Sequence, residues 1–150
     1  MSVDSLRIYQ DARVASQEIY EIVKQWDDFN KNTLGTQLVR AVDSICSNIS
    51  EGYGRSATGE RLQFLFYADC SLQEAKTQLR LAADRELVEV DLAKDLVFLL
   101  KRLSIGIIEF CHALLERDES YQGSYRKRVE DRRKWRTQTT NDTPDLEDAY

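Results

Sequence analysis

The sequence predicts an all-α protein: an antiparallel, up-down-up-down four-helix bundle over residues 1–118, followed by a charged tail over residues 119–150. Three observations lead to this prediction. Apolar residues recur with the 3.6-residue period of a helix in four segments. The 150 residues hold one Pro and six Gly, too few for a strand-rich fold with many turns. The joins between the segments are short, which favours sequential helices that lie antiparallel to each other.

The first two helices are predicted at residues 6–29 and 34–51, separated by a polar break at 30–33. Asp4 or Ser5 would cap the first helix. Gly52 and Gly54 are expected to end the second helix in the left-handed conformation. The apolar stripe of the first helix is Leu6, Tyr9, Ala12, Ala15, Ile19, Ile22, Val23, Trp26 and Phe29, and that of the second is Leu34, Leu38, Ala41, Ile45 and Ile49.

The third helix is expected to begin at a cap formed by Ser56 or Thr58, with Glu60 in its first turn, where the helix dipole favours an acid. The fourth helix begins near Asp91 and is apolar around much of its circumference. Such a helix is either central in the bundle or faces a second partner as well. Because a lone bundle needs only one buried stripe, we expect contact with another copy of the chain. On the second stripe of this helix, Ile108 and Leu115 are candidates to face outward.

The tail is predicted to be disordered or partly helical, because the apolar period stops at its start. Its charges are segregated along the chain. Residues 126–136 hold seven basic residues and two acids, whereas residues 137–150 hold four acids and no base. The whole chain has a net charge of −5, so this basic segment stands out against an acidic protein.

Several classes of function find no support in the sequence. The three cysteines, Cys46, Cys70 and Cys111, form no C-x-x-C pair, so neither a disulfide framework nor a cysteine zinc site is expected. His112, the one histidine, ends an E-x-x-H pattern, but a di-iron bundle needs two such patterns. We therefore expect no enzyme, no metal and no cofactor. Without a signal peptide or a run of ~18 apolar residues, the protein is expected to be cytoplasmic.

Residues 40–55, R-A-V-D-S-I-C-S-N-I-S-E-G-Y-G-R, resemble the signature of the four-helix-bundle proteins of 23S rRNA intervening sequences. The resemblance continues from Phe64 to Leu79 and covers about residues 5–117. Cys46, Ser50, Asp69-Cys70 and Lys76 depart from the family's usual residues. The signature positions carried over to this chain are Arg40, Ser44, Asn48, Glu51, Gly52 and Gly54.

The resemblance implies a bundle that assembles into a ring-like homopentamer, with no known catalysis. Relatives of the family include the accessory variability determinant of diversity-generating retroelements, a pentameric bundle that binds nucleic acid and a reverse transcriptase. From the resemblance, the expected partners are copies of the same chain, RNA or DNA, and a reverse transcriptase.

The basic segment is the strongest candidate to contact a polyanion, because its seven cations, with Tyr125 and Trp135 beside them, suit phosphate contact and base stacking along a strand of nucleic acid. The alternative is a solvated tail that binds nothing. Asn48 and Glu51 share a helix face and are expected to satisfy backbone groups at the glycine turn, which could instead present Tyr53 and Arg55 to RNA. The candidate contact residues are Arg126, Lys127, Arg128, Arg132, Arg133, Lys134, Trp135 and Arg136, with Tyr53 and Arg55 as secondary contacts.

Two functions remain open at this point. One is a nucleic-acid-binding accessory protein, and the other is an oligomeric scaffold that binds only protein partners. The tail separates the two, because the acidic bundle is poorly suited to broad polyanion binding.

Overall fold

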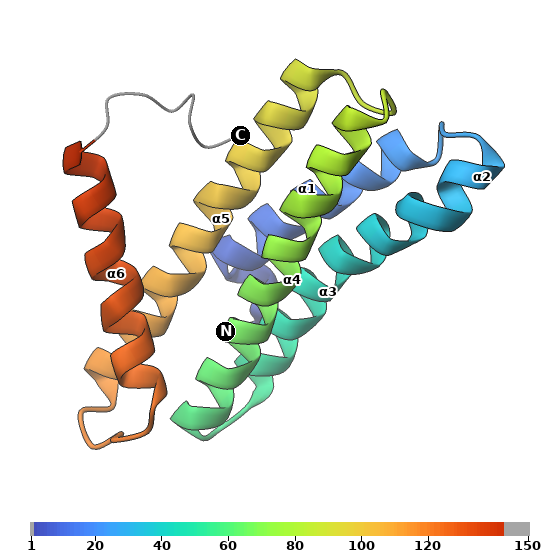
Figure 1. Ribbon diagram of the computed structural model, residues 1–150. Coiled ribbons are helices and arrows are strands. Elements are labelled where there is room, and N and C mark those ends of the chain that lie inside the picture. The colour runs from blue at the N-terminus through green and yellow to red at the C-terminus, as the bar shows by residue number, and fades with distance from the viewer. Residues whose placement is uncertain (1, 143–150) are drawn as a thin grey trace.

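Every regular element in residues 2–142, the part of the chain that the structure describes, is a helix in the computed structural model (Figure 1). The prediction of an all-α fold is confirmed. In chain order the elements are η1 (Val3–Ser5), α1 (Arg7–Val23), α2 (Asp28–Asn30), the π-helical turn η2 (Lys31–Gly35), α3 (Thr36–Gly54), α4 (Thr58–Asp84), α5 (Val90–Arg117) and α6 (Tyr125–Asp142).

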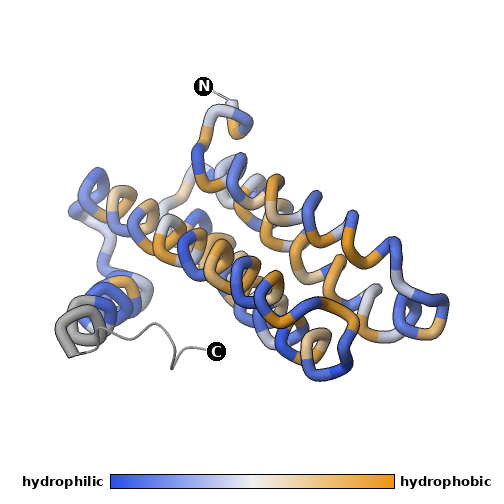
Figure 2. The backbone as a smooth tube through the Cα atoms, turned by 90° about the horizontal axis from the view of Figure 1, so that it is seen from above, coloured by the Kyte–Doolittle hydropathy of each residue, from blue (hydrophilic) through white to orange (hydrophobic). Residues whose placement is uncertain are grey.

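The core lies between the four long helices α1, α3, α4 and α5. Helix α3 packs against α1 and α4, and α5 packs against the same two helices from the other side. Figure 2 shows the hydrophobic positions of these helices directed toward the space they enclose. Each fully buried Leu or Ile contributes roughly 1.5–3 kcal/mol through removal of its side chain from water. These residues include Ile19, Leu38, Ile45, Leu65, Leu72, Leu100 and Ile107.

The corner between α1 and α3 differs from the sequence prediction. Helix α1 ends at Val23 rather than at Phe29, and residues 30–33, the expected polar break, are helical as parts of α2 and η2. Asp27 causes the early restart, because its carboxylate accepts a 3.1 Å hydrogen bond from the backbone N–H of Asn30 and caps α2. Trp26 is buried, as its place in the stripe predicted, but Phe29 is 74% exposed.

The two glycines of the signature, Gly52 and Gly54, do not adopt the left-handed backbone that the sequence predicted, and only Gly52 has a packing role. Helix α3 ends at Gly54, three residues after the predicted end, and no glycine in residues 2–142 has a positive φ. A Cβ atom built on Gly52 would lie 3.1 Å from both the carbonyl oxygen of Arg61 and the Cβ of Phe64. Gly52 thus allows α3 to approach α4 closely, whereas nothing lies within 4 Å of a Cβ on Gly54.

The predicted N-caps were also wrong in two places. Leu6 stands at the N-cap of α1 and Ala57 at that of α4, and neither makes a side-chain cap. The hydroxyl of Thr58 instead donates a 2.6 Å hydrogen bond to Asp118, just beyond the end of α5. Glu60 lies in the first turn of α4, as predicted.

Helix α5 buries the two residues that the sequence offered as outward-facing. Ile108 is 4% and Leu115 2% exposed within the single chain, so a charge at either position would damage the core. Phe98 and Ile105 are the large apolar residues in the middle of α5 that reach solvent, and they are 49% and 44% exposed. Seven residues apart, they share one face of the helix.

The tail was predicted to be disordered or partly helical, and residues 125–142 form helix α6, which packs on α5 and α4, so that disorder is not confirmed (Figure 1). Helix α6 is hydrophilic around most of its circumference, which is why periodicity did not reveal it (Figure 2). Side chains are described as far as Arg136, and residues 143–150 lie outside the described part. The division into a 1–118 domain and a tail stays a prediction.

Candidate nucleic-acid interface

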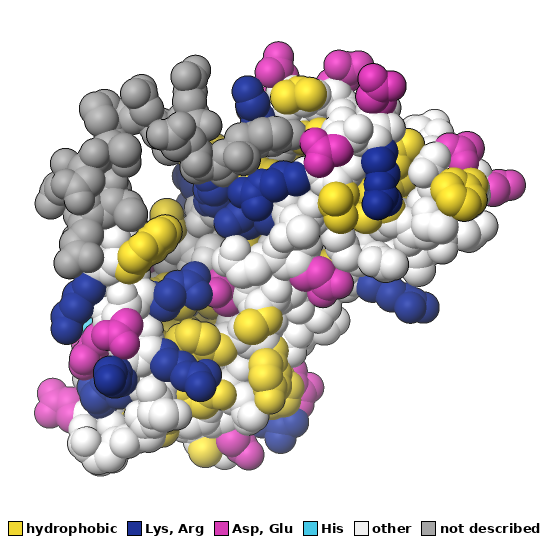
Figure 3. All heavy atoms as spheres, in the orientation of Figure 1, with side chains coloured by type: hydrophobic (Ala, Val, Ile, Leu, Met, Phe, Trp, Pro, Cys, Tyr) yellow, Lys and Arg dark blue, Asp and Glu magenta, His cyan; other side chains and the backbone are white. Residues whose placement is uncertain are grey.

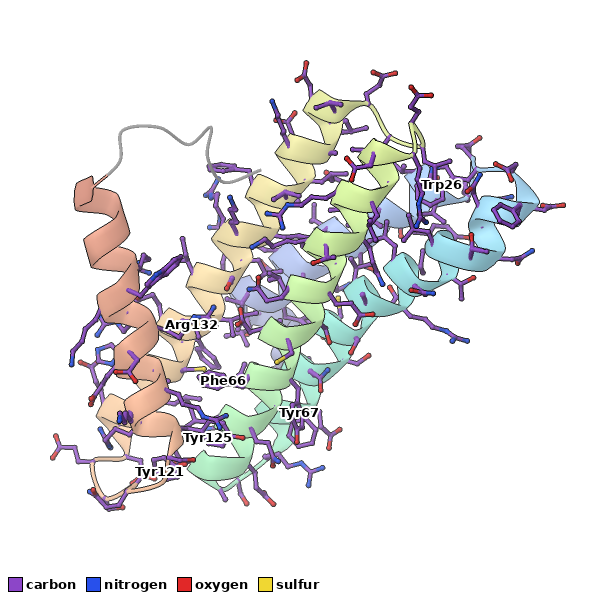
Figure 4. All side chains as sticks on the ribbon, viewed as in Figure 1. Trp26, Phe66, Tyr67, Tyr121, Tyr125 and Arg132 are labelled. Atoms are coloured by element: carbon purple, nitrogen blue, oxygen red, sulfur yellow. The ribbon has the colours of Figure 1, made fainter. Side chains whose placement is uncertain are left out.

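Helix α6 is attached to the bundle through a small apolar contact near its start. Val129 is fully buried. The ring of Tyr125 packs on Phe66 of α4 with 5.2 Å between ring centroids (Figure 4). Burial raises the pKa of the Tyr125 phenol above its ordinary value. These few contacts position the segment that carries the seven basic residues.

An ion pair between a buried aspartate and a half-buried arginine fixes the middle of α6. Asp69 of α4 is 3% exposed, and its carboxylate accepts a 2.7 Å hydrogen bond from Nη1 of Arg132 (Figure 4). The hydroxyl of Ser104 on α5 donates to the same carboxylate and accepts from Nη2 of Arg132 at 3.3 Å. A buried carboxylate needs such partners, so this network joins α4, α5 and α6.

Three further arginines of the basic segment also bind the chain itself. Arg133 and Arg136 both reach Oε1 of Glu109 on α5, at 3.3 Å and 2.9 Å. Arg126 donates to the backbone carbonyls of Tyr121 and Asp118, which holds the turn between α5 and α6. Four of the seven predicted contact cations therefore hold α6 in place, which the sequence analysis did not foresee.

The remaining cations of the segment lie on the outer side of α6. Lys127, Arg128 and Lys134 are exposed, and so is Trp135, at 65%. The guanidinium of Arg128 lies 5.3 Å from the centroid of the Tyr125 ring. Exposed acids, Glu130 and Asp131, lie on the same helix and reduce the positive potential of this side.

A second group of cations, missed by the sequence analysis, lies on α4 and α5 beside α6. Lys76 and Arg80 are four residues apart on α4, and Lys101 lies on the neighbouring helix. Burial lowers the pKa of Lys76, and the charges of Lys101, Arg80 and Arg132 lower it further. Figure 3 shows Lys and Arg side chains gathered over this part of α4 and α5. The sequence shows that Lys76 and Arg80 are one helical turn apart, but it does not show that helix packing adds Lys101 to them.

The signature residues form local contacts at the end of α3. The amide of Asn48 donates to the carbonyl and hydroxyl oxygens of Ser44 at 2.8 Å and 3.0 Å, one turn back and not at the glycines. Ser44 in turn shares a 2.9 Å hydrogen bond with Ser71 of α4. Arg40 is exposed. The expectation that Asn48 satisfies groups at the glycine turn was therefore wrong, because its amide reaches back into α3.

Glu51 and Arg55 pair with each other, and the Arg55 guanidinium lies 4.9 Å from the ring centroid of Phe64. Tyr53 is half-buried, and its carbonyl accepts from Arg61 of α4 at 3.4 Å. Both Arg55 and Tyr53 thus contribute to the α3–α4 junction. The partners named above, Glu51, Arg61 and Phe64, lie on α3 and α4.

An open cavity of about 480 Å³ lies beside this signature, between α1 and the end of α3. Burial, followed by the nearby charge of Asp43, raises the pKa of the Cys46 thiol to about 11. This thiol is fully protonated at neutral pH and is therefore a poor nucleophile. The cavity is lined by Tyr9, Cys46, Ser47, Ser50, Glu51, Gly54 and Arg55.

The other potential chemical groups are scattered. Nε2 of His112 lies 3.3 Å from Glu116, one turn along α5. Burial raises the pKa of the Cys111 thiol to about 12. Within the described residues, no three His, Cys, Asp or Glu side chains come close enough to hold a metal ion. The helices of that same part are all too short or too polar to cross a membrane.

Comparison with known proteins places this bundle in a family. No curated protein matches the sequence. The family model described as 23S rRNA-intervening sequence protein matches residues 4–108, which include α1, α3, α4 and the first two thirds of α5 and exclude α6. Because this match covers more than half of the chain and contains the whole signature, the chain belongs to the 23S rRNA-intervening sequence protein family.

Proposed function

We propose that this protein is a cytoplasmic, non-enzymatic accessory factor that binds single-stranded RNA or DNA through its phosphate backbone. The proposal rests on the different contacts made by the two sides of α6. Its inward arginines fix the helix on the bundle, and its outer side presents Lys127, Arg128 and Lys134 beside the exposed ring of Trp135. Cations that follow a backbone and an aromatic ring that stacks on any base are the elements of sequence-independent binding.

Binding is expected to be weaker than it would be if all seven cations of the basic segment contacted phosphates. Three outward cations can neutralise about three phosphates, which gives a slope of log K against log salt near −2 on a single strand, at about −0.7 for each phosphate. Changing Lys127, Arg128 and Lys134 together to Gln should abolish most of this salt dependence. Fluorescence anisotropy of a labelled 20-nucleotide strand, titrated at several salt concentrations, measures both affinity and slope.

The matched control removes three cations from α1, by Arg7→Gln, Arg13→Gln and Lys24→Gln. This control changes the net charge as much as the α6 variant does but leaves α6 unchanged, so it should bind like the parent chain. Deletion of residues 141–150, which hold four acids, should tighten binding because these acids compete for the same cations. Equal loss of affinity in both triple variants would show that net charge alone matters. Failure of the parent chain to bind at low salt would favour the protein-only scaffold.

We also propose that the protein assembles as a homo-oligomer, with five copies as the family resemblance implies. The exposed face of α5 with Phe98 and Ile105 supports contact with another chain, because large apolar side chains at the surface mark interaction sites. Several copies of α6 on one particle would multiply weak contacts with a strand. A reverse transcriptase is the protein partner that the resemblance suggests. The same exposed face also suits the alternative, a scaffold that binds proteins only.

Light scattering tests the assembly. The parent chain should give a mass near five times the 17.4 kDa of one chain at micromolar concentration. Phe98→Lys should dissociate the particle while circular dichroism keeps the helical signal, because Phe98 is half exposed and outside the core. Glu89→Lys, on the exposed N-cap of the same helix, is the matched control. A stable monomer of the parent chain would contradict the proposal.

A further inference from the structure

The open cavity between α1 and the end of α3 has the size of a ligand site and a polar lining. Its volume of about 480 Å³ lies within the range of pockets that hold small ligands, roughly 300–1,000 Å³. The lining consists of three hydroxyls, one thiol, one glycine and the Glu51–Arg55 pair. We call this space the signature cavity. Helix α6 packs on α4 and α5, so the signature cavity is separate from the candidate nucleic-acid interface.

Gly54 keeps the signature cavity open. It lines the cavity, and a Cβ atom built on it would meet nothing within 4 Å. Gly52 allows α3 to pack closely on α4, but packing gives no such reason for a glycine at position 54. Gly54 is the last residue of α3 and has no positive φ, so alanine would be the more stable choice there. A ligand that occupies the space beside Gly54 would explain the glycine.

The charges of the signature cavity favour a neutral ligand with hydroxyl groups. Glu51 and Arg55 pair with each other, so together they attract neither a free anion nor a free cation strongly. The pair uses Oε1 of Glu51, and a carboxylate offers about four acceptor sites, so Glu51 can accept from a further donor. Ser47 donates to the carbonyl of Asp43 at 3.1 Å and keeps its own oxygen as an acceptor. A carboxylate beside such acceptors suits the hydroxyls of a ribose.

The ring of Tyr9 adds a flat surface to this lining. Tyr9 is half-buried and packs partly against the hydrophobic core, which holds the ring in place. The guanidinium of Arg13 lies 5.9 Å from the centroid of the same ring. Unstacked bases bind to aromatic rings and to guanidinium planes. The signature cavity therefore combines an acceptor for sugar hydroxyls with a surface for a base.

We propose that the signature cavity binds one ribonucleoside, with its base on the Tyr9 ring and its ribose 2′-hydroxyl donating to Glu51. Gly54 lies three residues after Glu51, on the same face of α3, and leaves room for the sugar. The 2′-hydroxyl distinguishes RNA from DNA, so the site makes the protein prefer RNA where the ribonucleoside belongs to a strand. Only this preference rests on the proposed function, because a free ribonucleoside needs no contact with α6.

Isothermal titration calorimetry of the full chain with adenosine tests the site without a phosphate. Adenosine should bind at millimolar concentration, and 2′-deoxyadenosine about tenfold more weakly, because it lacks a hydrogen bond to a charged group. Neither ligand carries a phosphate, so the cations of α6 contribute little to either affinity. Absence of adenosine binding, or equal affinity for the two nucleosides, would overturn the inference.

Substitutions in the signature cavity give a second test. Gly54→Ala should weaken adenosine binding about tenfold through overpacking, while the unfolding temperature stays the same or rises. Tyr9→Phe should retain the affinity, whereas Tyr9→Leu should bind about tenfold more weakly without the stacking ring. Glu51→Ala should bind both nucleosides equally, and Glu18→Ala, at an exposed acid of α1, is the matched control that keeps the preference. If Gly54→Ala binds adenosine like the parent chain, the inference is wrong.

Labelled 20-nucleotide strands of RNA and DNA with the same sequence show where the ribonucleoside comes from. The parent chain should bind RNA more tightly, and Gly54→Ala should bind both strands equally with an unchanged salt dependence, because the phosphate contacts of α6 remain. If adenosine is preferred over 2′-deoxyadenosine while the two strands bind alike, the signature cavity is a site for free ribonucleosides. If adenosine binds but neither strand does at low salt, the proposed function fails and the site remains.

Discussion

Replacing Arg132 with Met should detach α6 from the bundle and lower the free energy of unfolding by about 3 kcal/mol, the lower end of the range for breaking a buried ion pair. The Asp69 side chain is only 4% exposed, and without Arg132 its charge would keep Ser104 as its described donor. Met retains the apolar stem of the arginine, so the effect isolates the guanidinium. The loss of stability is limited because α6 can detach, and water can then reach the Asp69 carboxylate.

Hydrogen–deuterium exchange and urea unfolding measure this effect. Amides of α6 should exchange much faster in Arg132→Met, while those of α3 keep their protection. Arg133→Met is the matched control on the same helix, because its partner Glu109 is 36% exposed and also binds Arg136. Such a pair is worth less than about 1 kcal/mol. Equal losses in the two variants would show that the buried network does not hold α6.

Replacing Gly52 with Leu should lower the free energy of unfolding by about 3 kcal/mol, because overpacking displaces backbone and side chains. The first added atom would already lie 3.1 Å from the carbonyl oxygen of Arg61, which belongs to a helix and cannot move away by itself. The strain must therefore separate α3 from α4 along their contact. The junction between α3 and α4, which includes the Glu51–Arg55 pair, should open as the two helices separate.

Gly54→Ala is the control for this substitution. A Cβ at Gly54 meets nothing within 4 Å and the residue is helical with no positive φ, so Ala should raise stability by about 0.5 kcal/mol through its higher helix propensity. Thermal and urea unfolding of both variants give the comparison. If Gly52→Leu were as stable as the parent chain, the close approach of α3 and α4 would not depend on this glycine.

The sequence was a good guide to the four long helices, because each one buries a regular apolar stripe. Ile45 and Leu72, for example, are both on predicted stripes and fully buried. It was a poor guide to the α1–α3 corner, where the stripe runs on to Phe29 but the cap at Asp27 starts a new helix. A local hydrogen bond prevailed there over an apolar period.

Helix α6 and the cations that gather on α4 and α5 could not be predicted from sequence patterns, for a different reason. The inner side of α6 consists mainly of arginines whose partners are up to 63 residues away, as in the Arg132–Asp69 pair. A pattern of hydrophobic residues cannot show such a contact. Likewise, Lys76 and Lys101 approach each other only because α4 packs on α5. The roles of Gly52 and Gly54 also depended on the neighbouring helix, which the local sequence does not contain.

The Asp69–Arg132 pair makes the C-terminal helix difficult to dispense with. If α6 stays docked without Arg132, Asp69 is a nearly buried charge with Ser104 as its described donor, which costs several kcal/mol. If α6 detaches, water reaches the carboxylate, but the packing of Val129 and Tyr125 on the bundle is lost. Either half of the pair is therefore costly to replace alone, and a helix outside the family's matched region is tied to the bundle inside it.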